Sequence, residues 1–483
     1  MILRLAALLA AALAATAPST GSLLLRGGMV VDGTGAPARP ADLRVRGDRI
    51  TDVGEALAPA PGDRVVDVTG LVVAPGFIDL HSHVDRQIFG LSAQSQTAQG
   101  ITTAVVGVDG GGPYPVGAFL ERLARSPAAL NVAALVGHAA VRRAVMGEAP
   151  RRATLREANA MAHRVSRALE EGAFGLSSGL EYEPGYQAAP PEIAILARAA
   201  APTLYATHVR SEGDSAMDAL AEAVDVGRRT GIAVHVSHLK LASSATRGRA
   251  AEALAVLAAE DADVTADWYP YPFWVSTTAA LVPPRSGEEA WARVIADAGG
   301  AARLTVTSFV ADPSYEGRTV ADLAAAQGRT AVDVLRDLAR RGHAGLAGQA
   351  MDEGDLEAFL RSPRVMIASD GGIRIAHPRG AGTFPRVLGV YVRERGVIGL
   401  ESAVHKMTGM PARRLGLDGR GRIAPGAYAD LVVFDAGTIA DRATALQPNL
   451  PPAGIAHVLV NGVAVVWDGR PPPARPGRPL RRR

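Results

Sequence analysis

Two histidines one residue apart carry the clearest chemical signal in the sequence. The segment Ala74–Asp85 contains a Pro-Gly break and an apolar run from Phe77 to Leu80, followed by His81 and His83. A short apolar run after such a break is typical of a buried strand. In a strand, residues i and i+2 point to the same side, so both imidazoles can face one metal ion. Taken alone, this short motif is equally compatible with two surface histidines that only form hydrogen bonds and bind no metal.

The strands that would position these groups alternate with helical sequence. Apolar, β-branched runs are separated by stretches rich in Ala, Leu, Glu and Arg. The predicted strands are Phe77–Leu80, Ile101–Val108, Asn131–Val136, Ala173–Ser177, Thr203–His208, Ala233–His238, Val264–Tyr271 and Val365–Ser369. This α/β alternation predicts parallel strands, and eight of them favour a closed (β/α)8 TIM-like barrel over an open sheet.

In such a barrel, the reacting groups lie at the C-terminal ends of the strands. The polar residues at or just after those predicted ends are His81, His83, Asp109, His208, His238 and Asp370. Each alone could simply cap, pair or be solvated, but their joint placement predicts one site. Imidazole and carboxylate ligands suit Zn²⁺, which activates a bound water when one coordination position stays open. Asp370 is the candidate to take the proton of that water and pass it to a leaving amine.

Two β-rich ends flank this central region. Short strand-like segments fill residues 22–74 and 421–470, and Asn461-Gly462 between apolar runs predicts a hairpin turn. We expect the two ends to form one small β-sandwich domain around a barrel that spans residues 75–420. Residues 287–361 exceed one crossover connection and are predicted to be an insertion. The Pro- and Arg-rich residues 471–483 are predicted to be a disordered tail.

Composition limits the class of protein. With 20% charged and 48% hydrophobic residues and a formal net charge of +3, the chain is typical of a folded globular protein. No basic stripe with interleaved aromatic residues is present, so we expect no nucleic-acid partner. The count of zero cysteines excludes disulfides, thiolate ligands and cysteine nucleophiles.

The N-terminus predicts export. Residues 1–17 combine a basic residue, Arg4, with an apolar run from Leu5 to Ala15 and small residues suited to cleavage. This pattern is typical of a secretory signal peptide, so a periplasmic or secreted location is expected. No later run reaches the roughly 18 apolar residues of a membrane-spanning helix, and no membrane anchor is expected.

Several motifs together resemble the N-acyl-D-amino-acid deacylase (D-aminoacylase) family of the metal-dependent amidohydrolase superfamily. They are Pro75–His83, Gly175–Tyr182, Tyr205–Gly213, Ser237–Lys240, Trp268–Tyr271, Ser369–Gly371, His377–Arg379 and Gly382–Arg386. The resemblance covers residues 22–470 and implies a barrel with a small β-domain. It implies that His208 and His238 bind a tightly held zinc, that His81 and His83 form a second, weaker metal site, and that Asp370 is catalytic.

The resemblance also implies a set of substrate contacts. Lys240, Arg379 and one tyrosine, either Tyr269 or Tyr271, would bind the substrate carboxylate, and Tyr271 is the preferred candidate. Lys240 faces the same way as a predicted ligand two residues earlier, and a planar arginine fork matches a carboxylate. His138 resembles a family position near the substrate.

One departure from the family concerns the metal ligands. Where the family commonly has a cysteine after the second strand, this chain has Asp109, a harder donor that can alter metal preference or occupancy. Other branches of the superfamily bridge two metals with a carboxylated lysine. The only lysines are Lys240 and Lys406, and neither follows a third or fourth strand, which disfavours a hydantoinase or dihydroorotase site.

The expected activity is zinc-dependent hydrolysis of the linear amide bond of N-acyl-D-amino acids, which are small molecules. A dipeptidase for D- or isoaspartyl-type bonds is the alternative within the same chemistry. A binding protein that retains the barrel without catalysis is the alternative from another class.

Overall fold

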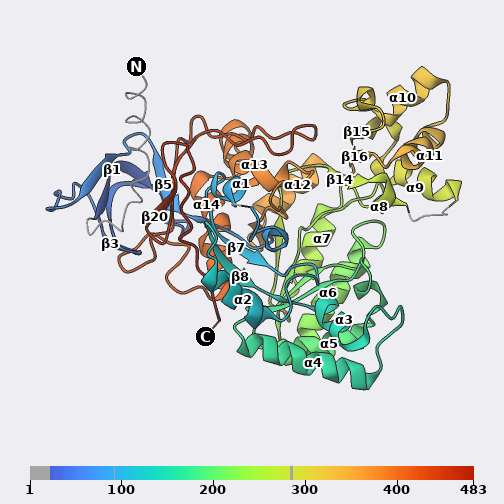
Figure 1. Ribbon diagram of the computed structural model, residues 1–483, viewed down its shortest axis with the longest axis horizontal. Coiled ribbons are helices and arrows are strands. Elements are labelled where there is room, and N and C mark those ends of the chain that lie inside the picture. Colours follow the sequence, from blue (N-terminus) through green and yellow to red (C-terminus); the bar gives the residue numbers. More distant parts are fainter. Residues whose placement is uncertain (1–21, 92, 283–286, 483) are drawn as a thin grey trace, which may run out of the picture.

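The computed structural model describes residues 22–91, 93–282 and 287–482. The predicted signal peptide, residues 1–17, lies outside these ranges. The chain has a mixed α/β architecture, in which a β-rich end, a central region of parallel strands and helices, and a projecting segment follow one another (Figure 1). No helix in the described ranges has the length and apolarity needed to cross a membrane.

Both ends of the chain contribute to one sheet. Its strands are β1 (Leu23–Val30), β2 (Arg39–Arg46), β3 (Arg49–Gly54), β4 (Arg64–Asp67), β5 (Val72–Pro75), β18 (Leu431–Phe434), β19 (Ile455–Val460) and β20 (Val463–Val466). β5 and β18 join the two ends, because Val72–Pro75 pairs antiparallel with Leu431–Phe434. Figure 1 accordingly shows β1, β3, β5 and β20 at one end of the molecule.

The central region is built on parallel strands. They are β6 (Phe77–Asp79), β7 (Ile101–Val106), β8 (Asn131–Ala134), β9 (Val136–Gly137), β10 (Gly175–Gly179), β11 (Leu204–His208), β12 (Ala233–Val236), β13 (Val264–Trp268) and β17 (Val365–Ile367). Their order is β6-β7-β8 in one sheet and β9-β10-β11-β12-β13-β17 in the next, and only Leu135 separates β8 from β9. Every one of the eight predicted strand segments forms, although most end one to three residues earlier than predicted.

Helices pack against these strands and against one another. They are α1 (Gln94–Thr97), α2 (Val116–Arg125), α3 (His138–Met146), α4 (Leu155–Glu170), α5 (Pro190–Ala200), α6 (Ala216–Thr230), α7 (Ala250–Leu257), α12 (Glu353–Arg361), α13 (Arg379–Arg386), α14 (Leu400–Met407) and α15 (Gly409–Leu415). In α4, Thr154 and Glu157 form a capping box, and the buried residues recur every three or four positions. The strands are buried because helices pack on them, which is typical of parallel sheets.

The first and last parallel strands meet through side chains. Across the described chain, β6 and β17 share no ladder of backbone hydrogen bonds. Instead, the Asp79 carboxylate accepts hydrogen bonds from Ser369 N at 2.8 Å and Ser369 Oγ at 2.5 Å. Just beyond the strands, His83 N donates to Gly371 O at 2.7 Å. Asp79 therefore joins the two edges in place of a ladder, and its burial raises the pKa of its carboxyl to about 6.

The insertion has different bounds from the predicted 287–361. It comprises β14 (Trp274–Thr277), α8 (Thr278–Leu281), α9 (Glu288–Ala298), β15 (Leu304–Ser308), α10 (Val320–Gln327), α11 (Ala331–Arg341) and β16 (Gly345–Gly348). β14 pairs antiparallel with β16, a contact between distant segments that no local pattern reveals. The helix α12, predicted as part of the insertion, instead leads into β17. The segment projects from the central region opposite the β-rich end (Figure 1).

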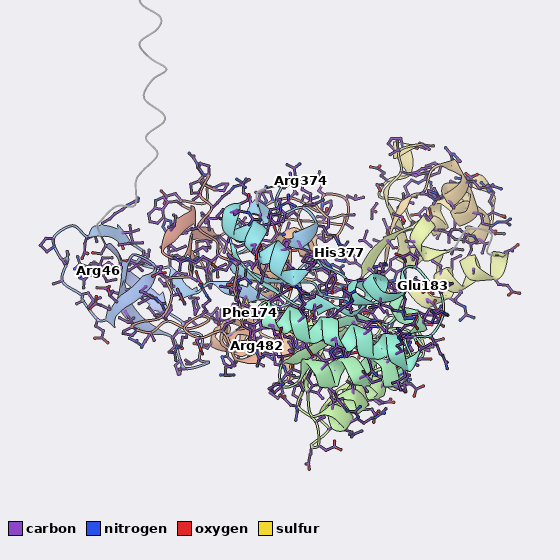
Figure 2. The ribbon with its side chains drawn as sticks, turned by 60° about the horizontal axis from the view of Figure 1, so that its bottom comes forward. Arg46, Phe174, Glu183, Arg374, His377 and Arg482 are labelled. Carbon is purple, nitrogen blue, oxygen red and sulfur yellow. The ribbon has the colours of Figure 1, made fainter. Side chains whose placement is uncertain are left out.

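The prediction of a disordered tail at residues 471–483 is wrong for the part that the structure describes. Val132 N donates to Arg478 O at 3.0 Å, and Leu480 N donates to Val132 O at 2.8 Å. Arg482 N donates to Gly172 O, and Figure 2 shows Arg482 beside Phe174. Composition predicted disorder, but the open edge of β8 supplies hydrogen-bond partners for this segment.

We expect Asp79→Ala to destabilise the protein, because it leaves the buried Ser369 N–H and hydroxyl without their acceptor. The expected loss is about 2 to 3 kcal/mol of unfolding free energy, measured by urea denaturation. Asp261→Ala is the control, because it removes only a surface ion pair to Arg228 and should leave the urea midpoint unchanged. Equal midpoints for Asp79→Ala and the unchanged protein would contradict the role of Asp79.

Candidate metal centre

The predicted metal-binding and catalytic residues gather at the C-terminal ends of the parallel strands. His81, His83, Asp109 and Asp370 form one group whose ligand atoms all lie within 4.8 Å of one another. Asp109, His208 and His238 form a second group by the same measure. Asp109 belongs to both groups, so the two clusters are adjoining parts of one centre.

Unusual backbone conformations direct three of these side chains inward. Asp109, His238 and Asp370 have positive φ angles of 52°, 35° and 47°. Residues other than glycine rarely adopt this region, and such strain concentrates at functional sites. Each of the three stands just past the end of its strand, where the chain turns sharply. This turn also explains why the ladders end earlier than the apolar sequence predicts.

The Asp109 carboxylate lies between the histidines. Its Oδ2 is 3.2 Å from His81 Nε2 and 3.3 Å from His83 Nε2, and its Oδ1 is 3.5 Å from His238 Nε2. Although buried, Asp109 Oδ1 has no hydrogen-bond partner within the described ranges. His208 Nδ1 faces His238 Nε2 at 2.8 Å. Ring nitrogens and an unpartnered carboxylate oxygen that converge in this way are suited to hold a cation.

The electrostatics of the centre also favour a cation. Burial lowers the pKa of His81, but the charges of Asp109, Asp370 and Asp267 outweigh burial and raise that pKa well above its usual value. Burial would raise the pKa of Asp370, yet Arg379 and the neighbouring histidines hold it well below the usual range. The buried carboxylates thus create a negative potential around the imidazoles, which can lose their protons when a cation binds. The residues present fit zinc, with nitrogen and oxygen ligands only.

A carboxylate lies behind each of three histidines, and none of these carboxylates was predicted from the sequence. Asp267 Oδ2 is 3.5 Å from His81 Nδ1, Glu181 Oε2 is 2.8 Å from His208 Nε2, and Glu212 Oε1 is 2.8 Å from His238 Nδ1. Carboxylates in such positions orient metal-binding imidazoles and fix their tautomers.

Two sequence signals could have identified them. Asp267 is a charged residue inside the buried strand β13, where an acid requires a polar partner. Glu181 and Glu212 stand shortly after β10 and β11, at the same edge as the predicted ligands.

A cavity of about 650 Å³ opens onto this centre. Its lining includes Glu181, Tyr182, Glu212, His238, Lys240, Tyr269, Trp274, Asp370 and Arg379. Trp274 comes from β14, so the insertion supplies one wall of the cavity. A small molecule that enters would meet the metal-binding side chains and a cationic surface together.

Three of the predicted substrate contacts line this cavity. Arg379 Nη1 lies 2.8 Å from Asp370 Oδ2, and its guanidinium lies over the Tyr269 ring, 4.9 Å from the centroid. Lys240 Nζ is 3.1 Å from Glu212 Oε1 and 3.4 Å from Tyr269 Oη. A carboxylate bound here would contact two cations and a phenol, which suits the predicted anchor.

The other two predicted contacts do not line the cavity. The hydroxyl of Tyr271 donates to Asp441 Oδ2 at 3.3 Å, and of the two tyrosines it is Tyr269 that lines the cavity. The preference for Tyr271 over Tyr269 therefore stays a prediction that the cavity lining does not support. His138 is buried, with Nε2 2.9 Å from Glu192 Oε1, and holds α3 to α5 instead of facing substrate. Both side chains lie away from the cavity lining, because spacing alone does not determine which way a residue beyond a strand end points.

Known proteins resemble this chain over most of its length. The model of the amidohydrolase family matches residues 64–466. The N-acyl-D-glutamate deacylase of Alcaligenes xylosoxydans xylosoxydans is 42% identical over 95% of this chain and 96% of that protein. The D-aminoacylase of the same organism is 40% identical over 92% of this chain and 94% of its own length.

A solved structure matches over almost the whole chain. The N-acyl-D-glutamate deacylase from Bordetella bronchiseptica, complexed with zinc and a phosphonate inhibitor, has a TM-score of 0.82 and 38% identity, and the match covers 95% of this chain and 99% of that one. A D-aminoacylase studied for its binuclear metal centre matches with the same score, identity and coverage. A D-hydantoinase at 17% identity and a TM-score of 0.60 shares the fold.

We expect His208→Ala to lose zinc, because it removes a nitrogen that lies 2.8 Å from His238 Nε2 in the ligand group that also contains Asp109. Metal analysis of the purified, zinc-loaded variant should show at least tenfold less tightly bound zinc than the unchanged protein. His163→Ala is the matched control, because His163 is exposed on α4 and should not affect zinc. Full zinc retention by His208→Ala would refute its role as a ligand.

Proposed function

The chain belongs to the amidohydrolase family, and from this premise we propose that it hydrolyses the linear amide bond of N-acyl-D-amino acids in a zinc-dependent reaction. The observation that carries the proposal is the meeting of metal centre, proton carrier and carboxylate anchor in one cavity. The products would be a carboxylic acid and a free D-amino acid. Relatives with this activity in their names cover nearly the whole chain.

The side chains divide the reaction between them. His208, His238 and Asp109 would hold one zinc ion, and His81 and His83 with the same Asp109 would hold a second. When bound, zinc supplies Lewis acidity that lowers the pKa of a water and polarises a carbonyl.

Asp370 is the proton carrier in this scheme. Its Oδ1 lies 3.2 Å from His83 Nε2, at the metal centre, and its Oδ2 contacts Arg379 in the cavity. The carboxylate is therefore placed to take the proton of the attacking water and deliver it to the nitrogen of the cleaved amide. Lys240, Tyr269 and Arg379 would hold the substrate carboxylate, which fixes the distance between that carboxylate and the amide bond.

We propose further that the eight parallel strand segments constitute a (β/α)8 barrel, with the shared sheet of the chain ends as its small β-sandwich domain. The Ser82–Gly371 bridge and the Asp79–Ser369 hydrogen bonds support closure of the barrel. Residues 22–74 and 421–470 would form the small domain around the barrel at residues 75–420. Export through a signal peptide at residues 1–17 is proposed from the sequence alone.

Stereochemical preference tests the proposed function most directly. A ninhydrin assay of amine release should show that the zinc-loaded protein hydrolyses N-acetyl-D-amino acids at least 100-fold faster than their L-enantiomers. D- and isoaspartyl dipeptides belong in the same screen. A preference for the L series, or for dipeptides alone, would contradict the deacylase assignment and leave the metal centre intact.

Asp370→Asn should separate proton transfer from metal binding. The amide keeps the shape of the side chain but cannot accept the proton, so kcat should fall by about 10² to 10⁴-fold. Zinc content should remain within twofold of the unchanged protein, since the nitrogen ligands and Asp109 remain. An active Asp370→Asn variant would remove Asp370 from the proposed proton transfer.

A further inference from the structure

Glu212 lies between the metal centre and the cationic wall of the cavity. It follows β11 by four residues, and its side chain is 12% exposed. One oxygen, Oε1, lies 2.8 Å from His238 Nδ1 and 3.1 Å from Lys240 Nζ. A single carboxylate oxygen therefore contacts both a metal-binding imidazole and a cation of the proposed substrate anchor.

The contact with His238 determines which ring nitrogen can bind metal. His238 Nδ1 faces Glu212, whereas Nε2 faces His208 Nδ1 at 2.8 Å and Asp109 Oδ1 at 3.5 Å. An imidazole that donates from one nitrogen to a carboxylate keeps the lone pair of the other nitrogen free and becomes a stronger ligand. Glu212 thus orients the ring and raises its basicity toward the centre.

The contact between Glu212 and Lys240 reduces the effect of Glu212 on the basicity of His238. Within the described ranges, Glu212 is the carboxylate with which Lys240 forms an ion pair, and Tyr269 Oη at 3.4 Å is its neighbour on the cavity side. An ammonium group at this distance draws electron density from the shared oxygen. A substrate carboxylate in the cavity would compete with Glu212 for the same ammonium group.

We propose that Glu212 is a positioning residue that couples zinc affinity to occupancy of the substrate-carboxylate site at Lys240. When a carboxylate ligand pairs with Lys240, the contact between Lys240 and Glu212 weakens. Glu212 then interacts more strongly with His238, and zinc binds more tightly. By linkage, bound zinc then strengthens carboxylate binding by the same factor. The carboxylate half of this coupling rests on the proposed function, whereas the effect of Glu212 on zinc does not.

Zinc affinity of Glu212→Gln tests the first half. Competition with a chromophoric chelator should show zinc binding about 10- to 100-fold weaker than in the unchanged protein, and far-UV circular dichroism should show that the zinc-free variant is folded. Glu222→Gln is the matched control, because Glu222 is a similarly buried glutamate on α6 that pairs with Arg210 at 2.8 Å. Unchanged zinc affinity in Glu212→Gln would overturn the proposal. If this variant does not fold, Glu212→Asp, whose shorter side chain cannot contact both partners, should weaken zinc binding by a smaller factor.

Lys240→Met tests the coupling. With Glu212 present, removal of the ammonium group should tighten zinc binding at least threefold, and in the Glu212→Gln background it should have no effect. The same change in both backgrounds would overturn the coupling. These measurements need no substrate, so they remain decisive even if no N-acyl amino acid is hydrolysed, a result that would contradict the proposed function alone.

Discussion

The contact between the first and last parallel strands is the constraint on which the site depends. His81 and His83 follow β6, and Asp370 follows β17, so these groups meet only if the two strands lie edge to edge. The hydrogen bonds from Ser369 to Asp79 hold this edge where no backbone ladder does. Asp79, a buried acid two residues before His81, therefore serves the fold and the site together.

Inside the metal centre, the Asp109 carboxylate holds the two groups of histidines together. Its two oxygens face different histidines, so this one side chain connects the two potential metal positions. Its positive φ angle shows that the backbone is strained to place it there. A hard oxygen donor at this position, in a chain without cysteine, makes the centre one of nitrogen and oxygen ligands throughout.

The sequence predicted the ligands better than their supports. His208 could be identified because it ends a predicted strand, and His81 and His83 because they closely follow a buried strand at a spacing of two residues. The carboxylates behind them come from neighbouring strands and loops, and their pairing depends on strand order in space, which spacing along the chain does not encode. The directions of the Tyr269 and Tyr271 side chains could not be predicted for a related reason, since both residues lie beyond the last paired residue of β13.

Long-range backbone pairing also explains where the fold predicted from the sequence differs from the structure. The insertion is held by β14 and β16, whose contact spans most of the segment, so its limits could not be found locally. The tail carries a composition typical of disorder, yet Arg478 and Leu480 pair with Val132 near the start of β8. In both cases, distant backbone partners decided the structure against the local pattern.

The central claim is that residues from four strand ends bind zinc beside Asp370, which comes from a fifth strand end. A zinc-edge anomalous difference map from crystals of the zinc-loaded protein tests it directly. We expect a peak within about 2.0 to 2.3 Å of the ligand atoms of His208, His238 and Asp109. Any second peak should lie beside His81 and His83. A map with no peak among these residues, or with zinc bound elsewhere, would contradict it.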